Sequence, residues 1–568
     1  MNGNFSFWDF LILGVYAITI LFVGLWVSRS KKGHQKNAED YFLASKSLPW
    51  WAIGASLIAA NISAEQFIGM SGSGFAIGLA IASYEWMAAI TLIIVGKFFL
   101  PVFIEKGIYT IPEFVEKRYS TNMKTILAIF WIALFVFVNL TSVLFLGAKA
   151  LDTVIGDGNG GLLYPCMIAL ALFAAAYSLW GGLSAVAWTD VIQVVLLVIG
   201  GLVTTFIALT HVPGAEGIVD GFIKLVEMVP EKFQMILGKG DVMVQNYISP
   251  EYAEAANAPL TKDAWWDLPG IAVLVGGLWI ANLYYWGFNQ YIIQRTLAAK
   301  SLKESQRGII FAGYLKLILP LIVVIPGIVA YVIATNEGLL TVEDWTASPF
   351  VKADGSVNPD AAYPWLVSRF IPMGLKGLVV AALAAAVVSS LASMINSTST
   401  IFTMDIYKPY FNKNASDKQI VSVGRITAAV ALLIAVLIAP LLGSVGQVFQ
   451  YIQEYTGMVS PGILAVFLMG LFWKKATNNA AIWGAILSII IAIFFKVGPV
   501  NMPFMHQMFI TCLATMVIIV IISLIEGKGK DNPKGIHFTK NLFATDPVFN
   551  IGAFGILIIS VVLYAVFW

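Results

Sequence analysis

Residues 50–71 read WWAIGASLIAANISAEQFIGMS, an apolar run long enough to cross a membrane that is interrupted by the polar block Asn61-Ile62-Ser63-Ala64-Glu65-Gln66. A charged side chain at the centre of a transmembrane helix costs about 2.5–3.5 kcal/mol on insertion scales, so such residues usually line a cavity or an ion path. The plainer alternative is that these side chains bond a neighbouring helix. The block therefore predicts a broken helix that carries polar groups at membrane depth.

The rest of the chain has the composition of a polytopic membrane protein. Apolar residues make up 59% and charged residues 12% of its 568 residues, whereas soluble domains carry about 25% charged residues. The net charge is only +2, and the basic residues are scattered over short connections, which argues against nucleic acid as a partner. The two cysteines and four histidines show no disulfide or zinc-ligand spacing. The first apolar stretch runs into Ser28-Arg29-Ser30-Lys31-Lys32 with no cleavage site, which favours a membrane anchor over a removed signal peptide.

Apolar runs of transmembrane length predict an all-α fold of about fourteen helices. The predicted spans cover residues 9–27, 50–71, 77–103, 124–150, 162–180, 186–210, 270–291, 308–334, 373–404, 420–442, 446–472, 479–497, 507–525 and 548–567. Most alternate connections are basic, while 211–268 and 335–365 are acidic or neutral. The positive-inside rule then places the basic connections in the cytoplasm and both termini outside.

The order of these spans permits a core of five plus five helices related by an inverted repeat. The two sets would start on opposite sides of the membrane, and the first helix of each would be broken. Breaking signals stand in both, at 61–66 and at Gly276-Gly277 with 282–285. We divide the chain into a first helix with its basic loop (1–49), the first repeat (50–210), an extracytoplasmic segment (211–269), the second repeat (270–473) and three peripheral helices (474–568).

Four further spans contain side chains that hydrocarbon would reject. They are Tyr84-Glu85, Lys316, Ser389-Ser390 and the group Gln450, Gln453 and Glu454. Lys316 could reach the interface or pair with an acid, and the two serines could simply allow close helix packing. Taken together they predict a polar centre. Its amides donate and accept like sugar hydroxyls, and Glu85 and Lys316 offer charge-assisted bonds, so the centre suits a neutral polyhydroxylated solute.

Four motifs in order resemble the sodium/solute symporter family. They are NISAEQFIGMSG at 61–72, ANLYYWGFNQ at 281–290, AAAVVSSLAS at 384–393 and FQYIQEYTG at 449–457. The resemblance covers nearly the whole chain and is strongest with sugar-carrying bacterial members. It implies a symporter, not an enzyme, that imports a neutral sugar, galactose or glucose, together with Na⁺ by alternating access across the lipid bilayer.

The resemblance also implies roles for single residues. It assigns sugar hydrogen bonds to Gln66, Glu85, Asn282, Lys316 and Gln453, support of that set to Asn61 and Glu65, the outer gate to Met70, Tyr84 and Phe449, and the inner gate to Tyr285, stacked on the sugar, with Trp286 beside it. It assigns Na⁺ to the main-chain carbonyls of Ala59, Ile62 and Ala386 and the hydroxyls of Ser389 and Ser390, and the ion exit to Asp190. One departure from the family pattern is Ala88, where a serine is expected near the sugar.

Two functions of other classes compete with the symporter. A membrane glycosidase would use Glu65 and Glu85 as its paired carboxylates, but the surrounding amides suit binding rather than hydrolysis. A sugar sensor or sodium leak would use the same site without productive coupling. Within the symporter class, another neutral polyol such as an inositol is the competing substrate.

Overall fold

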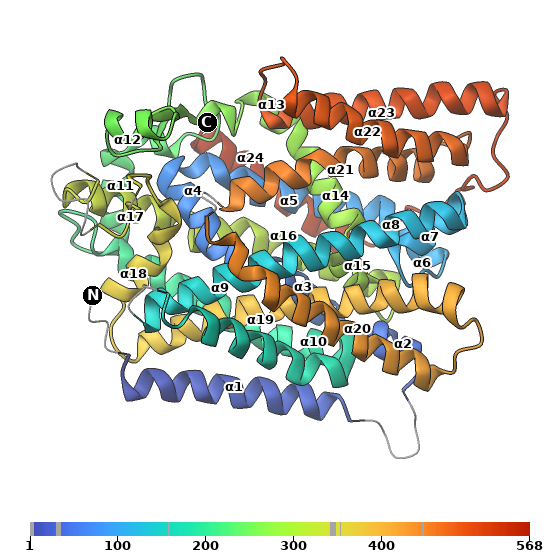
Figure 1. The fold of residues 1–568 in the computed structure, drawn as a ribbon, viewed down its shortest axis with the longest axis horizontal. Helices are drawn as coiled ribbons and strands as arrows, with labels where there is room; N and C mark the ends of the chain where they lie inside the picture. The colour runs from blue at the N-terminus through green and yellow to red at the C-terminus, as the bar shows by residue number, and fades with distance from the viewer. Residues whose placement is uncertain (1–4, 30–35, 157–159, 341–347, 353, 445–447) are drawn as a thin grey trace.

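The computed structural model describes residues 5–29, 36–156, 160–340, 348–352, 354–444 and 448–568, without the side chains of residues 443, 444, 448–451 and 455. The fold is almost entirely helical, and the long helices run roughly along the horizontal axis of Figure 1. The long helices are α1 (Phe7–Val27), α8 (Thr121–Ala133), α9 (Leu140–Ile155), α10 (Leu163–Leu209), α16 (Leu302–Val323), α19 (Leu375–Ile401), α20 (Asp417–Ile438), α21 (Val448–Phe472), α22 (Asn478–Val497), α23 (Phe504–Gly527) and α24 (Pro547–Val566). The shorter ones are α2 (Ala38–Phe42), α3 (Trp50–Asn61), α4 (Ser71–Ala76), α5 (Ser83–Ile94), α6 (Leu100–Glu105), α7 (Ile111–Arg118), α11 (Ile218–Met228), α12 (Pro250–Ala255), α13 (Ile271–Val275), α14 (Gly277–Phe288), α15 (Gln290–Leu297), α17 (Ile325–Asn336) and α18 (Ala362–Phe370).

Helix length and hydropathy support the predicted membrane fold in its coarser form. In the described residues, 11 helices are long and apolar enough to cross a membrane, or up to 12 if the bent pair α13 and α14 counts as one span. The prediction of a polytopic all-α protein is confirmed, whereas the count of fourteen spans is not confirmed by this criterion. The helix α19 lies at the centre of the bundle. In its most apolar stretch 94% of the residues are buried, whereas in that of α1 only 17% are buried.

Part of the difference in span count lies in α10, where the sequence predicts two spans. This helix is 47 residues long, and at 1.5 Å per residue a straight helix of that length would measure about 70 Å, more than twice the hydrocarbon core. At Gly182 the backbone leaves helical geometry, with φ 61° and ψ −153°. A Cβ there would lie 2.3 Å from the carbonyl oxygen of Tyr41, so only glycine fits this turn.

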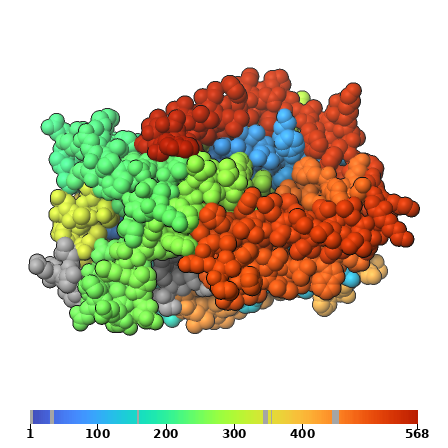
Figure 2. Space-filling model, turned by 90° about the horizontal axis from the view of Figure 1, so that it is seen from above, coloured from blue at the N-terminus to red at the C-terminus, as the bar shows by residue number. Residues whose placement is uncertain are grey.

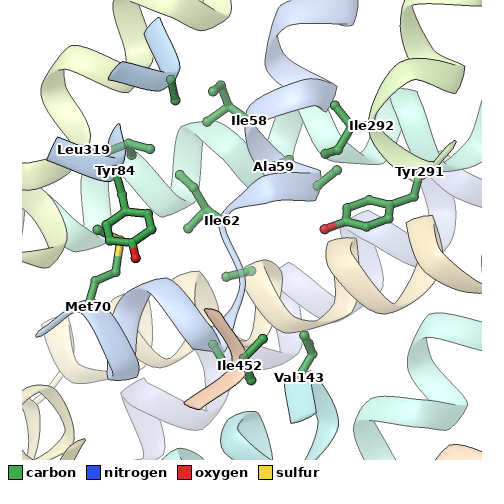
Figure 3. Close-up of a cluster of buried hydrophobic side chains, with 14 of the residues drawn as sticks. Ile58, Ala59, Ile62, Met70, Tyr84, Val143, Tyr291, Ile292, Leu319 and Ile452 are labelled. Carbon is green, nitrogen blue, oxygen red and sulfur yellow. The ribbon is translucent and has the colours of Figure 1, made fainter. Parts of the chain in front are cut away.

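The break predicted at 61–66 is present, and the second helix is broken at Gly276 as predicted, but residues 282–285 are not a break because they lie within the continuous helix α14. The helix α3 ends at Asn61, the backbone at Ile62 is extended, and helical structure resumes in a π-helical segment (Glu65–Met70) that leads into α4. The second break separates α13 from α14, which meet at an angle of 75°. Figure 3 shows the chain leaving helical geometry between Ala59 and Ile62. Backbone groups at such breaks lose their helical partners and can bind a ligand at the midplane.

The segment between α10 and α13 forms a small irregular structure at one end of the molecule. It contains α11, α12 and two antiparallel strands, β1 (Met243–Gln245) and β2 (Thr261–Asp263). The Met235 amide donates to the Phe567 carbonyl (2.7 Å), and Figure 2 shows the green residues of this part of the chain beside the red C-terminal residues. The segment therefore lies at the same end of the molecule as the C-terminus of α24.

One lysine of this segment caps α4, which forms the second half of the first broken helix. Lys232 Nζ donates to the carbonyl oxygens of Phe75 and Ala76, at 2.9 Å each, at the C-terminal end of α4. It also lies 4.0 Å from the centre of the Tyr331 ring. At Gly78 (φ 106°) a Cβ would lie 2.4 Å from the Lys232 carbonyl oxygen, so glycine allows the two backbones to approach closely. The segment is thus packed directly onto a helix that leads to the centre of the protein.

Candidate functional site

A cavity lies where the two broken helices meet α5, α16 and α21. Counted with its opening, it holds about 930 Å³. All eight residues predicted to form the sugar site line it, together with two further predicted gate residues and the position of the missing serine. These are Asn61, Glu65, Gln66, Glu85, Asn282, Tyr285, Lys316 and Gln453, with Tyr84, Trp286 and Ala88. The structure therefore brings together residues that are up to several hundred positions apart in sequence.

An ion pair forms one wall of the cavity. Lys316 Nζ donates to Glu85 Oε2 and to Asn61 Oδ1, and it lies 5.0 Å from the centre of the Trp286 ring. Lys316 is 1% and Glu85 4% exposed, so the lysine pairs with an acid and does not reach the membrane interface. Removal of one partner of such a pair leaves an uncompensated buried charge, which makes this wall sensitive to single substitutions.

A chain of hydrogen bonds connects this pair to the predicted inner gate. Asn61 Nδ2 donates to the Tyr285 hydroxyl (3.0 Å), which also accepts from the Tyr291 hydroxyl (2.7 Å). The Tyr285 and Trp286 rings lie 5.2 Å apart in an edge-to-face arrangement. Asn61 therefore links the charged wall to the aromatic side chains of the predicted inner gate.

The other amide side chains are held by bonds that leave polar atoms for a ligand. Gln66 Oε1 accepts from the Ser63 amide (2.9 Å) and hydroxyl (3.0 Å), and Asn282 Nδ2 donates to the Leu278 carbonyl (3.2 Å). Within the described part of the chain, Gln66 Nε2 and Asn282 Oδ1 make no hydrogen bond. One donor and one acceptor thus remain to bind a hydroxylated solute. Glu65 accepts from the Ser142 hydroxyl (2.7 Å), which fits its predicted supporting role.

The predicted outer gate is described only in part. Figure 3 shows Met70 beside Tyr84, with Tyr291 on the other side of the helix break. Both gate residues are buried, and Tyr84 lines the cavity whereas Met70 does not. Phe449 belongs to α21, but its side chain lies outside the described residues. Its gate role therefore stays a prediction.

The predicted sodium ligands gather at the first helix break. Ser390 Oγ lies 3.2 Å from the Ala60 carbonyl oxygen and 3.5 Å from that of Ile62. In a continuous helix the Ser63 amide would pair with the Ala59 carbonyl, but here it donates to Gln66. Ala386 is buried on α19, one turn before Ser390. Carbonyl and hydroxyl oxygens of this kind are ligands that hard cations prefer.

Ser389 differs from the other predicted sodium ligands, because its hydroxyl donates to Asp190 Oδ1 (2.5 Å). Asp190 Oδ2 also accepts from Ser56 (2.5 Å), which in turn accepts from Arg295 Nε (2.7 Å). Arg295 further donates to Ser393, and its Nη2 lies 3.4 Å from Asp190 Oδ2. These five buried side chains, from α3, α10, α15 and α19, form a network beside the predicted sodium site.

From its position, Arg295 counts among the basic residues of the connection between the predicted spans 270–291 and 308–334; it does lie there, in α15, but its side chain is 0% exposed and belongs to the buried network instead of facing the cytoplasm. Ser56 and Ser393 were not predicted either. The available signal was Asp190 itself, since an acid in an apolar span requires a cation. Glu454 is a second correction: it pairs with Lys496 away from the cavity, and both side chains are about one-third exposed. The side chain of Gln450 lies outside the described residues.

A polar cavity at the meeting point of two broken helices, inside a bundle of membrane-spanning length, defines a membrane transporter. The sodium:solute symporter family model matches residues 41–488. A sodium/glucose cotransporter of Vibrio parahaemolyticus is 60% identical over 569 residues, covering 100% of this chain and 99% of the relative. The chain belongs to the sodium:solute symporter family.

More distant relatives agree with this assignment. The human sodium/myo-inositol cotransporter 2 is 32% identical over 489 residues, which cover 85% of this chain and 69% of the relative. Among solved structures, a substrate-bound, outward-open Na⁺-coupled sialic acid symporter aligns with a TM-score of 0.75 at 23% identity, covering 92% of this chain and 98% of the other. This likeness shows a shared fold.

Proposed function

We propose that this protein is a sodium-coupled symporter that imports a neutral sugar, galactose or glucose, by alternating access. The proposal rests on one observation: the cavity lined by amide and charged side chains and the carbonyl and hydroxyl oxygens suited to sodium lie at the same helix break. Asn61 and Gln66 face the cavity, and Ser390 Oγ lies within 3.5 Å of the carbonyl oxygens of Ala60 and Ile62, the two residues that flank Asn61. The full-length relative named as a sodium/glucose cotransporter supports the same function. Sodium is the coupling ion, and the protein acts as a transporter in the membrane rather than as an enzyme.

The same arrangement suggests how the two solutes are coupled. A cation held between the carbonyls near Ile62 and the hydroxyl of Ser390 would tie α3 to α19 and favour the form in which the sugar site is assembled. The membrane potential supplies about 2.3 kcal/mol per charge per 100 mV, so inward sodium movement can drive sugar uphill. Gln66, Glu85, Asn282, Lys316 and Gln453 would bind the sugar. Tyr285 and Trp286 would close the inner side.

We also propose the finer topology. Two spans for α10, one for α3 with α4 and one for α13 with α14 would bring the count to fourteen helices, with units 50–210 and 270–473 as inverted repeats. The residues 1–49, 211–269 and 474–568 would then be the first helix with its loop, an extracytoplasmic segment and three peripheral helices. Both termini would lie in the periplasm of a bacterial inner membrane.

The second candidate substrate is another neutral polyol such as an inositol. It is favoured by Ala88, which lines the cavity where the family pattern has a serine, and by the relative named as a myo-inositol cotransporter. An uncoupled sensor or sodium leak would use the same cavity. These candidates differ in accumulation against a gradient and in the solute that competes.

The deciding experiment is uptake of labelled galactose into proteoliposomes that hold the purified protein. An inward sodium gradient is compared with a potassium gradient, and glucose and myo-inositol serve as competitors. Sodium-dependent accumulation that glucose suppresses supports the proposal. Suppression by inositol alone would transfer the function to a polyol symporter, and flux without accumulation would favour the leak.

A further inference from the structure

A second pocket lies apart from the sugar cavity, where α7 meets the end of α6 and the connection that precedes α24. It holds about 310 Å³ counted with its opening, and it shares no lining residue with the sugar cavity. Four of its six lining residues are basic. The lining consists of Lys106, Phe114, Lys117, Arg118, Lys534 and Ile536. In Figure 1, α6 and α7 lie toward the right-hand end of the molecule, opposite the end that carries α12.

The positive charge of this pocket is only partly balanced by neighbouring acids. Lys117 pairs with Glu113 at 2.9 Å. Among the described residues, no carboxylate oxygen lies within 4.0 Å of a side-chain nitrogen of Lys106, Arg118 or Lys534. The nearby Glu116 is bonded to Lys124 instead (2.6 Å). Three cations therefore face a small space without a carboxylate to pair with.

Arg118 makes this space more than a patch of surface lysines. It is 1% exposed, and it binds the end of α21 through Nε to the Gly470 carbonyl (2.8 Å) and Nη2 to the Trp473 carbonyl (3.0 Å). Its Nη1 is buried and has no hydrogen-bond partner within the described part of the chain. A buried donor without a partner costs about 1–3 kcal/mol, and more in a charged group, so an anion that accepts from Nη1 would relieve this cost.

The lysines complete an arrangement suited to an oxyanion. Lys534 Nζ donates to the Tyr119 carbonyl (2.8 Å), which holds its connection against α7. Lys117 Nζ donates to the Lys106 carbonyl (2.8 Å), which holds the end of α6 in the same way. Arginine and lysine side chains are the usual recognition groups for phosphate. Arg118 would contribute through Nη1, because its Nε and Nη2 already bond the end of α21. Basic pockets at the membrane boundary of helical bundles bind anionic head groups.

We propose that this pocket binds a phosphate group. The group is supplied either by the head group of an anionic phospholipid or by a soluble phosphate compound. The proposal does not depend on the sugar or on the sodium site, since neither contributes a residue to the pocket. Its structural alternative is that Arg118 only fastens α7 to α21.

The test uses the full-length protein, purified in detergent and stripped of lipid. Dihexanoyl-phosphatidylglycerol, dihexanoyl-phosphatidylcholine and inorganic phosphate are titrated separately, and the rise in the thermal unfolding midpoint reports binding, because a ligand that binds only the folded state stabilises it. The variant is K106Q/K534Q, which spares the buried arginine. The matched control is K413Q/K418Q, which removes two exposed lysines, one from the connection before α20 and one from the first turn of α20.

We expect the wild type and K413Q/K418Q to be stabilised by phosphatidylglycerol or by inorganic phosphate, but not by phosphatidylcholine. The K106Q/K534Q variant should need roughly 25-fold more of the same ligand, because each lysine near a membrane surface contributes about fivefold in affinity. A response to phosphatidylglycerol alone identifies a lipid source, and a response to inorganic phosphate identifies a soluble one. Equal titration of K106Q/K534Q and wild type, a response to phosphatidylcholine equal to that to phosphatidylglycerol, or no stabilisation by any of the three, overturns the proposal.

Discussion

The ion pair between Glu85 and Lys316 allows the stability of the cavity to be separated from its function. Either single variant, Glu85→Gln or Lys316→Gln, leaves one charge buried or one hydrogen-bonding group unsatisfied, which costs about 3–5 kcal/mol. With an unfolding entropy of about 2.1 cal/mol/K per residue, a chain of 568 residues has a total of about 1.2 kcal/mol/K. Each single variant should therefore unfold about 3–4 °C below the wild type.

The double variant E85Q/K316Q should regain most of this loss, because two neutral amides can hydrogen-bond each other and Asn61. Sugar uptake should stay low in all three variants, since a charge-assisted hydrogen bond contributes about 1.5–3 kcal/mol, or roughly 10-fold to 150-fold in affinity. The assays are thermal unfolding in detergent and sodium-driven uptake into proteoliposomes. The matched control is the pair Glu454 and Lys496, whose side chains are 39% and 34% exposed.

Neutralising both members of that exposed pair, as E454Q/K496Q, should shift the midpoint by less than about 1 °C, because exposed ion pairs contribute about 0–1 kcal/mol. The reasoning fails if E85Q/K316Q is no more stable than the less stable of its two single variants. It also fails if Lys316→Gln alone raises the unfolding midpoint, because the desolvation cost of the buried lysine charge would then exceed the energy of its interactions with Glu85 and Asn61.

Three further predictions concern the sodium site, the buried network and the outer segment. Ser390→Ala should raise the half-saturating sodium concentration about tenfold, because a ligating hydroxyl contributes about 1–2 kcal/mol, while sugar affinity at saturating sodium stays near the wild type; unchanged sodium activation of uptake would refute this. Arg295→Met should lower the unfolding midpoint as much as Glu85→Gln, and a second change, Asp190→Asn, should recover part of it; no recovery in the double variant would show that the two are not coupled. Burial lowers the pKa of Lys232 to about 8, so the unfolded state binds this proton more tightly than the folded state. The free energy of unfolding should therefore rise as the pH increases from about 8 to about 10. A Lys232→Met variant whose unfolding midpoint rises by the same amount over this pH range would contradict this.

The polar residues inside apolar spans were enough to predict which side chains gather at a polar centre, but not which hydrogen bonds and ion pairs they form there. A polar side chain inside an apolar span has so few acceptable environments that Asn61, Glu85 and Lys316 could be assigned to one polar centre before their positions were known. The identity of the partners depends on how distant helices pack, and no local pattern encodes that. Arg295 illustrates this limit: it follows the second broken helix at a place where a basic connection is expected, and only packing shows that α15 carries it into the interior.

The number of spans shows a second limit. A hydropathy profile detects only the length and polarity of a span. The turn at Gly182 depends instead on the close approach of the Tyr41 carbonyl, which belongs to a distant part of the chain. The break at Ile62 was predictable because a polar block marks it. A break enforced by a tertiary contact at one glycine leaves a much weaker mark in the sequence.

The Ser63 amide has a consequence for how this protein can change during evolution. Its bond to Gln66 leaves the Ala59 carbonyl without a helical partner, so in the proposed mechanism a residue assigned to the sugar also shapes the main chain assigned to sodium. A substitution at Gln66 that adapts the cavity to a new solute would release the amide and disturb the ion ligands in the same step. Selection for a new substrate would then act on energy coupling as well, and the two traits could not drift independently at this position.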